Sequence, residues 1–500
     1  MGSFPAREYN AADDLLGRNA GRAEKIAYID DAGSCTFGEL ARRVNRVASA
    51  LRRLGVQPEQ RVLVAMLDTI DWPVVFLGAI RAGVIPVAAN TLLTTADYAY
   101  MLEDSRARAL FVSPALLPQF APLLSSVEHV ISDAAAFMAS GDDFCAPART
   151  TRDDPCFWLY SSGSTGAPKG TVHVHSSLAL TAELYAKPVL GIREDDVVFS
   201  AAKLFFAYGL GNALSFPLAA GATTLLMPER PTPQAVFKRL VERRPTIFYA
   251  VPTLYAALLA SAQFPQALNL RICTSAGEAL PRELGERWKA RTGVDILDGI
   301  GSTEMLHIFL SNRPGEVRYG TTGRPVPGYQ LRLTDEHGAD VAPDEVGDLW
   351  ISGPTAAAGY WNQREKSRAT FCGEWTRSGD KYSCDADGYY TFAGRSDDML
   401  KVSGIYVSPV EVEAALASHD AVLEAAVVGA EDAEKLVKPK AFVVLKQGGA
   451  GSDELKGVLQ QHVKGRLAPY KYPRWIEFVP ELPKTATGKI QRFRLRPQSV

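Results

Sequence analysis

The sequence is short of cysteine, of histidine and of long apolar runs, and each shortage excludes a class of protein. Its 500 residues include six cysteines and seven histidines. The cysteines are scattered, form no C-x-x-C pair and do not stand near histidine at metal-site spacing. We therefore expect reduced thiols rather than a disulfide framework or a zinc site. No uncharged apolar run reaches the roughly 18 residues of a membrane-spanning helix.

The charge balance excludes a second group of functions. The net charge is −2, so the chain has no broad basic field for nucleic acid or an anionic membrane. A hydrophobic content of 47% with 22% charged residues is typical of a soluble globular protein. The N-terminus has no basic region followed by an apolar stretch, so we expect no signal peptide and a cytoplasmic location. At this length we expect two or more domains.

Alternating strand and helix patterns predict a parallel α/β architecture. Thr36 and Glu39 form a capping box before a helical pattern that Gly55 closes. Strands and helices then alternate, which favours parallel sheets with crossover helices. The strands are predicted at 61–66, 84–88, 109–112, 246–250 and 271–275, and the helices at 72–82, 253–262 and 281–292.

The predicted secondary structure changes character twice towards the C-terminus. Between 320 and 395 short alternating runs, at 330–334 and 348–352, predict a smaller β unit. Ser408 starts a capped helix, and strands at 425–428, 440–445 and 475–479 with a helix at 453–466 predict a small α+β domain. The polar segment 394–398 between them has the composition of a hinge.

One segment points to phosphate. Residues 160–170 read YSSGSTGAPKG and follow the apolar run 157–160, which predicts a buried strand. Glycines, hydroxyls and one lysine in a single loop offer backbone N–H groups and a cation to a polyanion. A Walker A loop is excluded, because Pro168 stands where its second glycine belongs and Gly170 follows Lys169. We therefore predict a different phosphate-binding loop at a strand end.

This loop resembles the phosphate loop of the adenylate-forming superfamily, which includes acyl- and aryl-CoA synthetases. Other motifs extend the resemblance over nearly the whole chain. It implies a large N-terminal α/β domain of parallel sheets with a small β unit, followed by a small α+β domain on a hinge. We expect residues 1–396 to bind AMP and the acid, and residues 397–500 to move. The implied substrates and cofactors are ATP, Mg²⁺ and coenzyme A.

Two motifs carry the phosphates and the metal in this resemblance. Thr303 would contact the α-phosphate, and Glu304 would hold Mg²⁺, which prefers oxygen ligands. The phosphate cradle comprises Ser161, Ser162, Gly163, Ser164, Thr165 and Lys169. The adenosine-binding residues implied are Ala276, Gly277, Glu278, Asp298, Gly299, Ile300 and Ser302, with Asp380 and Arg395 at the ribose. Members of the superfamily often carry an aromatic residue where Ile300 stands, so the resemblance implies that an aliphatic side chain would face adenine here.

The resemblance also assigns two lysines to two half-reactions. Lys489 matches the lysine that bridges carboxylate and α-phosphate during adenylation, where charge builds up. Lys401 and Gly404 match the motif that faces the site during thioester formation, and Gly404 leaves room for a pantetheine arm. Asp397 matches the hinge residue about which the small domain turns. Lys489 also resembles sites of reversible acetylation, which implies a lysine acetyltransferase as a partner.

The segment around Tyr208 resembles the acid pocket of benzoate–CoA ligases. It implies a flat, mostly apolar slot, whose lining comprises Phe206, Ala207, Tyr208, Gly209, Gly301, His307 and Ile308. No lysine or arginine lies within 205–211 or 301–309, so a second acidic group on the substrate is disfavoured. His173 and His175, spaced as on one strand, are interpreted as structural rather than as metal ligands.

Several alternatives stay open from the sequence. His307 and Tyr208 could bind a ring substituent, so 4-hydroxybenzoate or 2-aminobenzoate are alternative acids. The motifs fit transfer to a carrier protein as well as to CoA, and we expect CoA because these 500 residues hold no carrier-domain sequence. A non-catalytic AMP sensor is disfavoured by the complete set of Lys489, Thr303 and Glu304. A homodimer is one hypothesis for the assembly, which the sequence does not fix.

Overall fold

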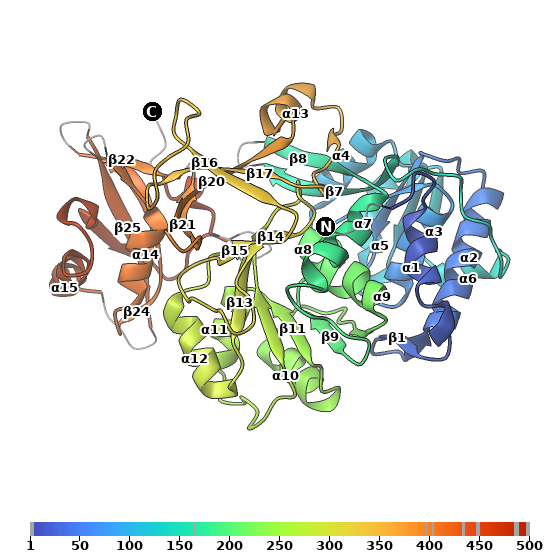
Figure 1. Ribbon diagram of the computed structural model, residues 1–500, viewed down its shortest axis with the longest axis horizontal. Coiled ribbons are helices and arrows are strands. Elements are labelled where there is room, and N and C mark those ends of the chain that lie inside the picture. Colours follow the sequence, from blue (N-terminus) through green and yellow to red (C-terminus); the bar gives the residue numbers. More distant parts are fainter. Residues whose placement is uncertain are drawn as a thin grey trace. The chain divides into compact units, whose positions relative to one another are not determined.

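The computed structural model describes residues 5–163, 166–396, 398–402, 405–432, 436–446, 451–484 and 490–496. The chain divides into two compact units (Figure 1). The first comprises residues 1–280, 284–331 and 351–377, and the second comprises 281–283, 332–350 and 378–500. The expected boundary between residues 396 and 397 was based on a hinge at Asp397. Because Asp397 lies outside the described residues, this boundary stays a prediction.

A seven-stranded sheet forms one half of the first unit, in the order β18-β8-β7-β4-β3-β5-β6. Its parallel strands are β3 (Arg61–Ala65), β4 (Ile85–Ala88), β5 (Ala109–Val112), β6 (His129–Ile131) and β7 (Pro155–Gly163). At one edge β8 (Gly166–Val174) and β18 (Gly359–Tyr360) run antiparallel. The parallel strands confirm the prediction, whereas the antiparallel edge was not predicted.

Helices cover both faces of this sheet, because its strands are apolar on both sides. Val62, Val64 and Phe111 face a core shared with α2 (Phe37–Arg53), α3 (Asp71–Arg81) and α6 (Ala134–Ala139). The alternate residues Leu63 and Leu110 face α4 (Thr95–Ser105) and α5 (Leu117–Phe120). In Figure 1 the blue helices α1 (Ala11–Gly17), α2, α3 and α6 lie side by side. The predicted capping box of Thr36 and Glu39 is present at the start of α2.

A nine-stranded sheet forms the other half, in the order β15-β14-β13-β12-β11-β9-β10-β1-β2. Six neighbouring strands are parallel, and they are β1 (Ile26–Ile29), β9 (Val197–Ser200), β10 (Thr223–Leu225), β11 (Ile247–Ala250), β12 (Ile272–Ser275) and β13 (Ile296–Gly301). Antiparallel strands close both ends, and they are β2 (Ser34–Thr36), β14 (Ile308–Ser311) and β15 (Arg324–Pro325). One face packs on α10 (Pro233–Glu242), α11 (Pro252–Ala260) and α12 (Arg282–Thr292).

Helical segments follow the phosphate-loop hairpin and strand β9. After β8 come α7 (Ser176–Thr181) and a π-helical turn, η4 (Ala182–Ala186). After β9 come α8 (Ala207–Leu210), a second π-helical turn, η5 (Gly211–Ser215), and α9 (Phe216–Ala220). Within the described residues, no helix combines the length and the hydropathy needed to traverse a bilayer.

A smaller five-stranded sheet confirms the predicted β unit. It comprises β16 (Gln330–Thr334), β17 (Gly347–Ser352), β19 (Phe371–Cys372), β20 (Trp375–Cys384) and β21 (Tyr390–Arg395). Helix α13 (Arg364–Thr370) precedes β19. The limits of the two compact units fall within β16, β17 and β20, so the change of unit does not coincide with a linker.

The C-terminal part of the second unit is the predicted α+β domain. Strands β24 (Val422–Glu431), β25 (Val437–Leu445) and β26 (Trp475–Phe478) form one sheet. It shares a core with α14 (Pro409–Ala417) and α15 (Asp453–Lys464). The Ser408 hydroxyl caps α14 by accepting a hydrogen bond from the N–H of Glu411, as predicted. A short hairpin of β22 (Leu400–Val402) and β23 (Ile405–Val407) precedes this helix.

Candidate active site

Two hairpins, one from each large sheet, meet in the first unit. In each sheet the last parallel strand turns back into an antiparallel one, β7 into β8 and β13 into β14. The first hairpin carries the predicted phosphate loop, and the second carries Thr303 and Glu304 in its turn. Strand β7 therefore continues through Ser161 to Gly163, where a loop was expected after Tyr160. The structure thus brings together two motifs that lie far apart in the sequence.

The contact between the hairpins centres on the Glu304 carboxylate. Its Oε1 atom accepts a hydrogen bond from the Tyr360 hydroxyl at 2.8 Å and one from Ser161 Oγ at 3.4 Å. The Lys169 ammonium lies 3.7 Å from the same oxygen. Lys169 also donates to the Tyr360 hydroxyl at 3.1 Å. The side chains of Lys169 and Glu304 are 18% and 16% exposed, so water screens this ion pair only partly.

His173 joins the two hairpins a second time. Its Nε2 lies 2.7 Å from the carbonyl oxygen of Thr303, so that nitrogen carries the proton. The ring is fully buried and stacks on Phe157 at 5.2 Å. His175 points elsewhere and accepts a hydrogen bond from the N–H of Ala11 through Nδ1. Both histidines are structural, as the spacing indicated.

The donor set around Glu304 fits a cation shared with a substrate. Both hydrogen bonds and the ion pair fall on Oε1, which leaves Oε2 without a partner among the described residues. The described part of the chain contains no group of three or more histidine, cysteine, aspartate or glutamate residues arranged to hold a metal. Mg²⁺ characteristically takes one or two carboxylates and completes its shell with water and phosphate oxygens. A single carboxylate beside a phosphate loop matches that pattern.

Other contacts brace the base of the phosphate loop. Tyr100 donates a hydrogen bond to the carbonyl of Pro168 at 3.0 Å. Gly170 packs against two tryptophans, and a Cβ atom there would be in ordinary van der Waals contact, 3.5 Å from Trp158 and from Trp361. Ser164 and Thr165 lie outside the described residues, as do Asp397, Gly404 and Lys489. The predicted roles of these five residues stay predictions.

The predicted adenosine segment follows β12 and lies along β13. Ala276 is buried, and Gly277 is exposed with a φ of +92°. Glu278 is partly exposed and precedes α12 in the sequence. Asp298 pairs in register with Ser275 on the neighbouring strand. Burial raises the pKa of Asp298 well above its ordinary value. Its Oδ1 atom is buried without a hydrogen-bond partner among the described residues.

The rest of this segment shapes the second hairpin. Ile300 is partly exposed on β13, opposite Leu310. A Cβ atom at Gly299 would lie 3.1 Å from Ile308, and one at Gly301 would lie 2.5 Å from the carbonyl oxygen of His307. Ser302 Oγ accepts a hydrogen bond from the N–H of Met305 at 3.1 Å and so closes the turn. Glycine is thus required at 301 by the close approach of the His307 backbone, whereas a side chain at 299 would need its neighbours to shift by a few tenths of an ångström.

The predicted acid-binding residues gather around His307. Its Nε2 lies 3.2 Å from the carbonyl oxygen of Tyr208 and 3.2 Å from Asn212 Oδ1. Both partners are acceptors, so Nε2 carries the proton and Nδ1 is a lone acceptor. The His307 ring centroid lies 5.6 Å from that of Tyr208 and 4.5 Å from that of Phe216. The structure therefore joins β14 to the α8–η5 segment through a buried polar group.

The start of this segment is held by tight packing. Phe206, Ala207 and Tyr208 are half-buried, and Gly209 begins the buried part. A Cβ atom at Gly209 would lie 2.0 Å from the carbonyl oxygen of Lys203. The Tyr208 hydroxyl forms a 2.5 Å hydrogen bond with Thr274 Oγ1. The π-helical turn η5 follows at once, and such turns are frequent at functional sites.

Two predicted ribose residues lie in the second unit and contact each other. Asp380 and Arg395 are register partners on β20 and β21. Arg395 donates a hydrogen bond to Asp380 Oδ1 at 2.8 Å. The Asp380 side chain is 11% exposed and that of Arg395 is 47% exposed. In the same unit Lys401 is paired with Tyr406 in the β22–β23 hairpin.

Two residues of the site were not predicted from the sequence. Tyr360 contacts both Lys169 and Glu304, and Asn212 contacts His307. Tyr360 is the last residue of β18, which pairs with β8 and is followed by Trp361. Nothing in its local spacing marks it, because the partners of Tyr360 lie far away in the sequence. Asn212 is a buried amide within an apolar segment, which was the available signal.

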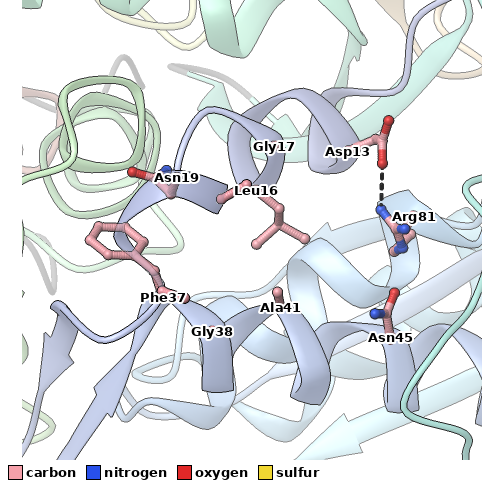
Figure 2. Close-up of a pocket in the computed structure, with 11 residues that line it drawn as sticks. Asp13, Leu16, Gly17, Asn19, Phe37, Gly38, Ala41, Asn45 and Arg81 are labelled. Carbon is pink, nitrogen blue, oxygen red and sulfur yellow. Dashed lines mark hydrogen bonds and ion pairs between the residues drawn. The ribbon is translucent and has the colours of Figure 1, made fainter.

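A cavity of about 320 Å³ lies away from these residues (Figure 2). It is lined by α1, α2 and the end of α3, and includes Leu16, Phe37 and Ala41. Figure 2 shows Asp13 and Arg81 pointing toward one another at its rim, where they form a 2.8 Å ion pair. None of the predicted site residues lines it, so it is a separate feature of the first unit.

Three buried histidines predict a loss of stability in mild acid. Burial lowers the pKa of His173 and of His175 to about 4, and that of His307 to about 3. These values lie below the ordinary pKa of about 6.5, so the unfolded chain binds more protons. The three histidines therefore cost no stability above a pH of about 6.5, and the free energy of unfolding falls as the pH approaches 4. We expect a loss of roughly 1–2 kcal/mol per histidine by pH 5, measured by urea unfolding.

A matched pair of variants tests this cause. His173→Gln keeps an N–H donor but cannot titrate, so it should lose less stability between pH 7 and 5 than the wild type. His337→Gln changes a histidine whose side chain is 82% exposed and should keep the wild-type pH dependence. An unchanged acid loss in His173→Gln would contradict the assignment.

The comparisons with known proteins agree with this geometry. Residues 17–361 match the family model of the AMP-binding enzymes, and residues 411–489 match that of the AMP-binding enzyme C-terminal domain. The chain is 66% identical to a benzoate–CoA ligase of Thauera aromatica, over 98% of this chain and 96% of that protein. It is 52% identical to a 4-hydroxybenzoate–CoA/benzoate–CoA ligase of Rhodopseudomonas palustris, over 99% and 95% respectively.

Solved structures lead to the same group. A benzoate CoA ligase from Burkholderia xenovorans LB400 superposes with a TM-score of 0.92 and 61% identity, covering 98% of this chain and all of that one. The family matches cover most of the chain, including the hairpins that carry Ser161, Lys169, Thr303 and Glu304. The chain therefore belongs to the family of AMP-binding enzymes.

Proposed function

We propose that the protein ligates benzoate to coenzyme A at the expense of ATP. In the first step a benzoate oxygen attacks the α-phosphorus of ATP, which forms benzoyl adenylate and releases pyrophosphate. In the second step the thiol of CoA attacks the acyl carbon, its proton leaves, and AMP departs. The 66% identity to the benzoate–CoA ligase of Thauera aromatica, over nearly the full chain, carries this proposal.

The chemistry of the predicted acid-binding residues supports an unsubstituted ring. The lowered pKa of His307 keeps it neutral near pH 7, and its N–H is used by Tyr208 and Asn212. The Tyr208 hydroxyl is occupied by Thr274. The segments 205–211 and 301–309 contain no lysine or arginine. A second carboxylate on the substrate would therefore be desolvated without a partner.

A substituted benzoate is the second candidate, and one observation favours it. Nδ1 of His307 is buried without a hydrogen-bond partner among the described residues. Because Nε2 carries the proton, Nδ1 could accept a hydrogen bond from a ring hydroxyl or amino group. The related ligase of Rhodopseudomonas palustris is named for both 4-hydroxybenzoate and benzoate. Hydroxy- and aminobenzoates are therefore the second class of acid to test.

The site of the first unit supports the adenylation step. Lys169 and Ser161 would contact phosphate oxygens, and Thr303 would contact the α-phosphate. Glu304 would hold Mg²⁺, which supplies positive charge that offsets the charge of the phosphates when it is bound. The ribose hydroxyls would be bound by Asp380, with Arg395 beside it. Lys489 would stabilise the charge that builds up between carboxylate and α-phosphorus.

The second step would use another face of the C-terminal domain. Lys401 and Gly404 would face the pantetheine arm, and the domain would turn about Asp397 to exchange Lys489 for Lys401. The motifs around these residues support this proposal. A homodimer is proposed as the assembly, and a lysine acetyltransferase acting on Lys489 as a regulator, since removal of that charge would stop adenylation.

A panel of acids tests the proposed substrate. With ATP and CoA in excess, benzoate should give the highest kcat/KM, because its ring carries no polar substituent that would be desolvated on binding. Hydroxy- and aminobenzoates should follow, and octanoate should be near background. A higher kcat/KM for 4-hydroxybenzoate or 2-aminobenzoate than for benzoate would overturn the choice of acid. Absence of acid-dependent pyrophosphate exchange with every acid would overturn the reaction itself.

The two lysines should separate the two steps. Lys489→Ala should lower benzoate-dependent ATP–pyrophosphate exchange by roughly 100-fold or more, since it removes charge stabilisation from the transition state. Lys401→Ala should keep most of that exchange and lose conversion of added benzoyl adenylate to benzoyl-CoA. Asp397→Pro should behave like Lys401→Ala, because a fixed φ prevents the turn. Equal losses of both steps in Asp397→Pro would contradict a hinge at this residue.

A further inference from the structure

The hydroxyl of Tyr360 lies between the two charged groups of the candidate active site. It is 3.1 Å from the Lys169 ammonium and 2.8 Å from Glu304 Oε1. The Lys169 ammonium itself lies 3.7 Å from that oxygen, beyond hydrogen-bond distance, and 4.3 Å from the centroid of the Tyr360 ring. The tyrosine therefore supplies the hydrogen bonds between the two members of this ion pair.

The direction of these hydrogen bonds follows from the groups involved. An ammonium group has donors only, so Lys169 donates to the tyrosine oxygen. A phenol has one proton, and it therefore goes to Glu304, whose ionised carboxylate is an acceptor only. Each bond has one charged partner, and such bonds are stronger than those between neutral groups. The result is an ordered chain from Lys169 through Tyr360 to Glu304.

Tyr360 is held in this place by contacts that need no nucleotide. Its backbone pairs with Thr171 of β8, and its N–H donates to Ser367 Oγ at 2.9 Å. Its ring packs against Phe371, with centroids 5.3 Å apart, and the residue is 7% exposed. The hydroxyl is thus a fixed point, whereas Lys169 and Glu304 are the ends of longer and more flexible side chains.

We propose that Tyr360 is a positioning residue that fixes the Glu304 carboxylate for the metal ion of the nucleotide. By occupying Oε1, the hydroxyl stops rotation of the carboxylate and leaves Oε2 to face the cation. In the nucleotide-free protein Tyr360 also holds Lys169 as a provisional partner of Glu304. When ATP and its cation bind, Lys169 transfers to a phosphate oxygen and the bond from Tyr360 to Glu304 remains. This inference rests on the proposed function only in assigning nucleotide and cation to this site.

The loss of the hydroxyl has a specific consequence. In Tyr360→Phe the Glu304 carboxylate loses the hydrogen bond that fixes it, and Lys169 can close on either of its oxygens. A tighter pair of Lys169 and Glu304 must be broken whenever Lys169 moves to a phosphate, with or without the cation, so its cost cancels in the ratio of the two affinities. Only binding of ATP with its cation uses the positioned carboxylate, so the tightening that the cation provides should become smaller.

The test is calorimetric titration of the full-length protein with ATP, without acid or CoA. Each variant is titrated once in excess Mg²⁺ and once in EDTA, and the readout is the ratio of the two dissociation constants. In Tyr360→Phe we expect the Mg²⁺-dependent tightening to fall by about tenfold, the size of one hydrogen bond to a charged group. Phenylalanine keeps the ring against Phe371, and thermal unfolding checks that the variant is folded.

Tyr329→Phe is the matched control. Tyr329 is a buried tyrosine of the same unit whose hydroxyl bonds to Thr355 at 2.6 Å, and the ratio should stay within about twofold of the wild type. A second check uses Glu304→Gln, in which Tyr360→Phe should have no further effect on the ratio, because the positioned carboxylate is gone.

Two results would overturn the inference. One is a ratio in Tyr360→Phe within about twofold of the wild type, and the other is an equal further loss in the Glu304→Gln background. Because the titration contains no acid and no CoA, a wrong choice of acid leaves it unaffected. Failure of the acid panel and failure of this titration are therefore separate findings.

Discussion

The Glu304 carboxylate is the point on which the candidate site depends. Groups from three separate strands or their ends converge on it, and they are Ser161 on β7, Lys169 on β8 and Tyr360 on β18. Glu304 itself belongs to the other large sheet, in the turn between β13 and β14. A negative charge that is only 16% exposed requires such partners. One charge thus joins the two sheets, and a cation would bind it once Lys169 has moved to a substrate phosphate.

The arrangement has a simple topological origin. Each large sheet is parallel in its centre and becomes antiparallel where the site lies. A parallel strand that turns directly into an antiparallel neighbour forms a hairpin, and its turn stays at the carboxyl end of the sheet. The buried His173 ties the hairpins together through the Thr303 carbonyl. Because burial keeps this histidine neutral near pH 7, it adds no charge that would compete for Glu304 or for phosphate.

Much of this could be predicted from the sequence, because the informative signals are local. The capping box of Thr36, the alternation of strands and helices and the glycine-rich loop each need only a few neighbouring residues. The structural role of His173 and His175 also followed from their spacing. Local signals could predict neither the antiparallel edge strands nor the contact of Tyr360 with Glu304. The pairing of β18 with β8 joins residues about 190 positions apart, and no periodicity reports such a pairing. Gly209 and Gly211 show the same limit. A Cβ atom at either position would clash, with the Lys203 carbonyl at 209 and with the His307 ring at 211.

A crystal structure of the protein with ATP and Mg²⁺ would test the exchange of partners most directly. The decisive quantities are the distances from Glu304 to the Lys169 ammonium and to the Tyr360 hydroxyl, which are 3.7 Å and 2.8 Å without nucleotide. We predict that the first increases beyond the roughly 4 Å of an ion pair while Lys169 contacts a phosphate oxygen. The second should remain a hydrogen bond. A structure in which Lys169 still pairs with Glu304, or in which Tyr360 has left the carboxylate, would contradict this view of the site.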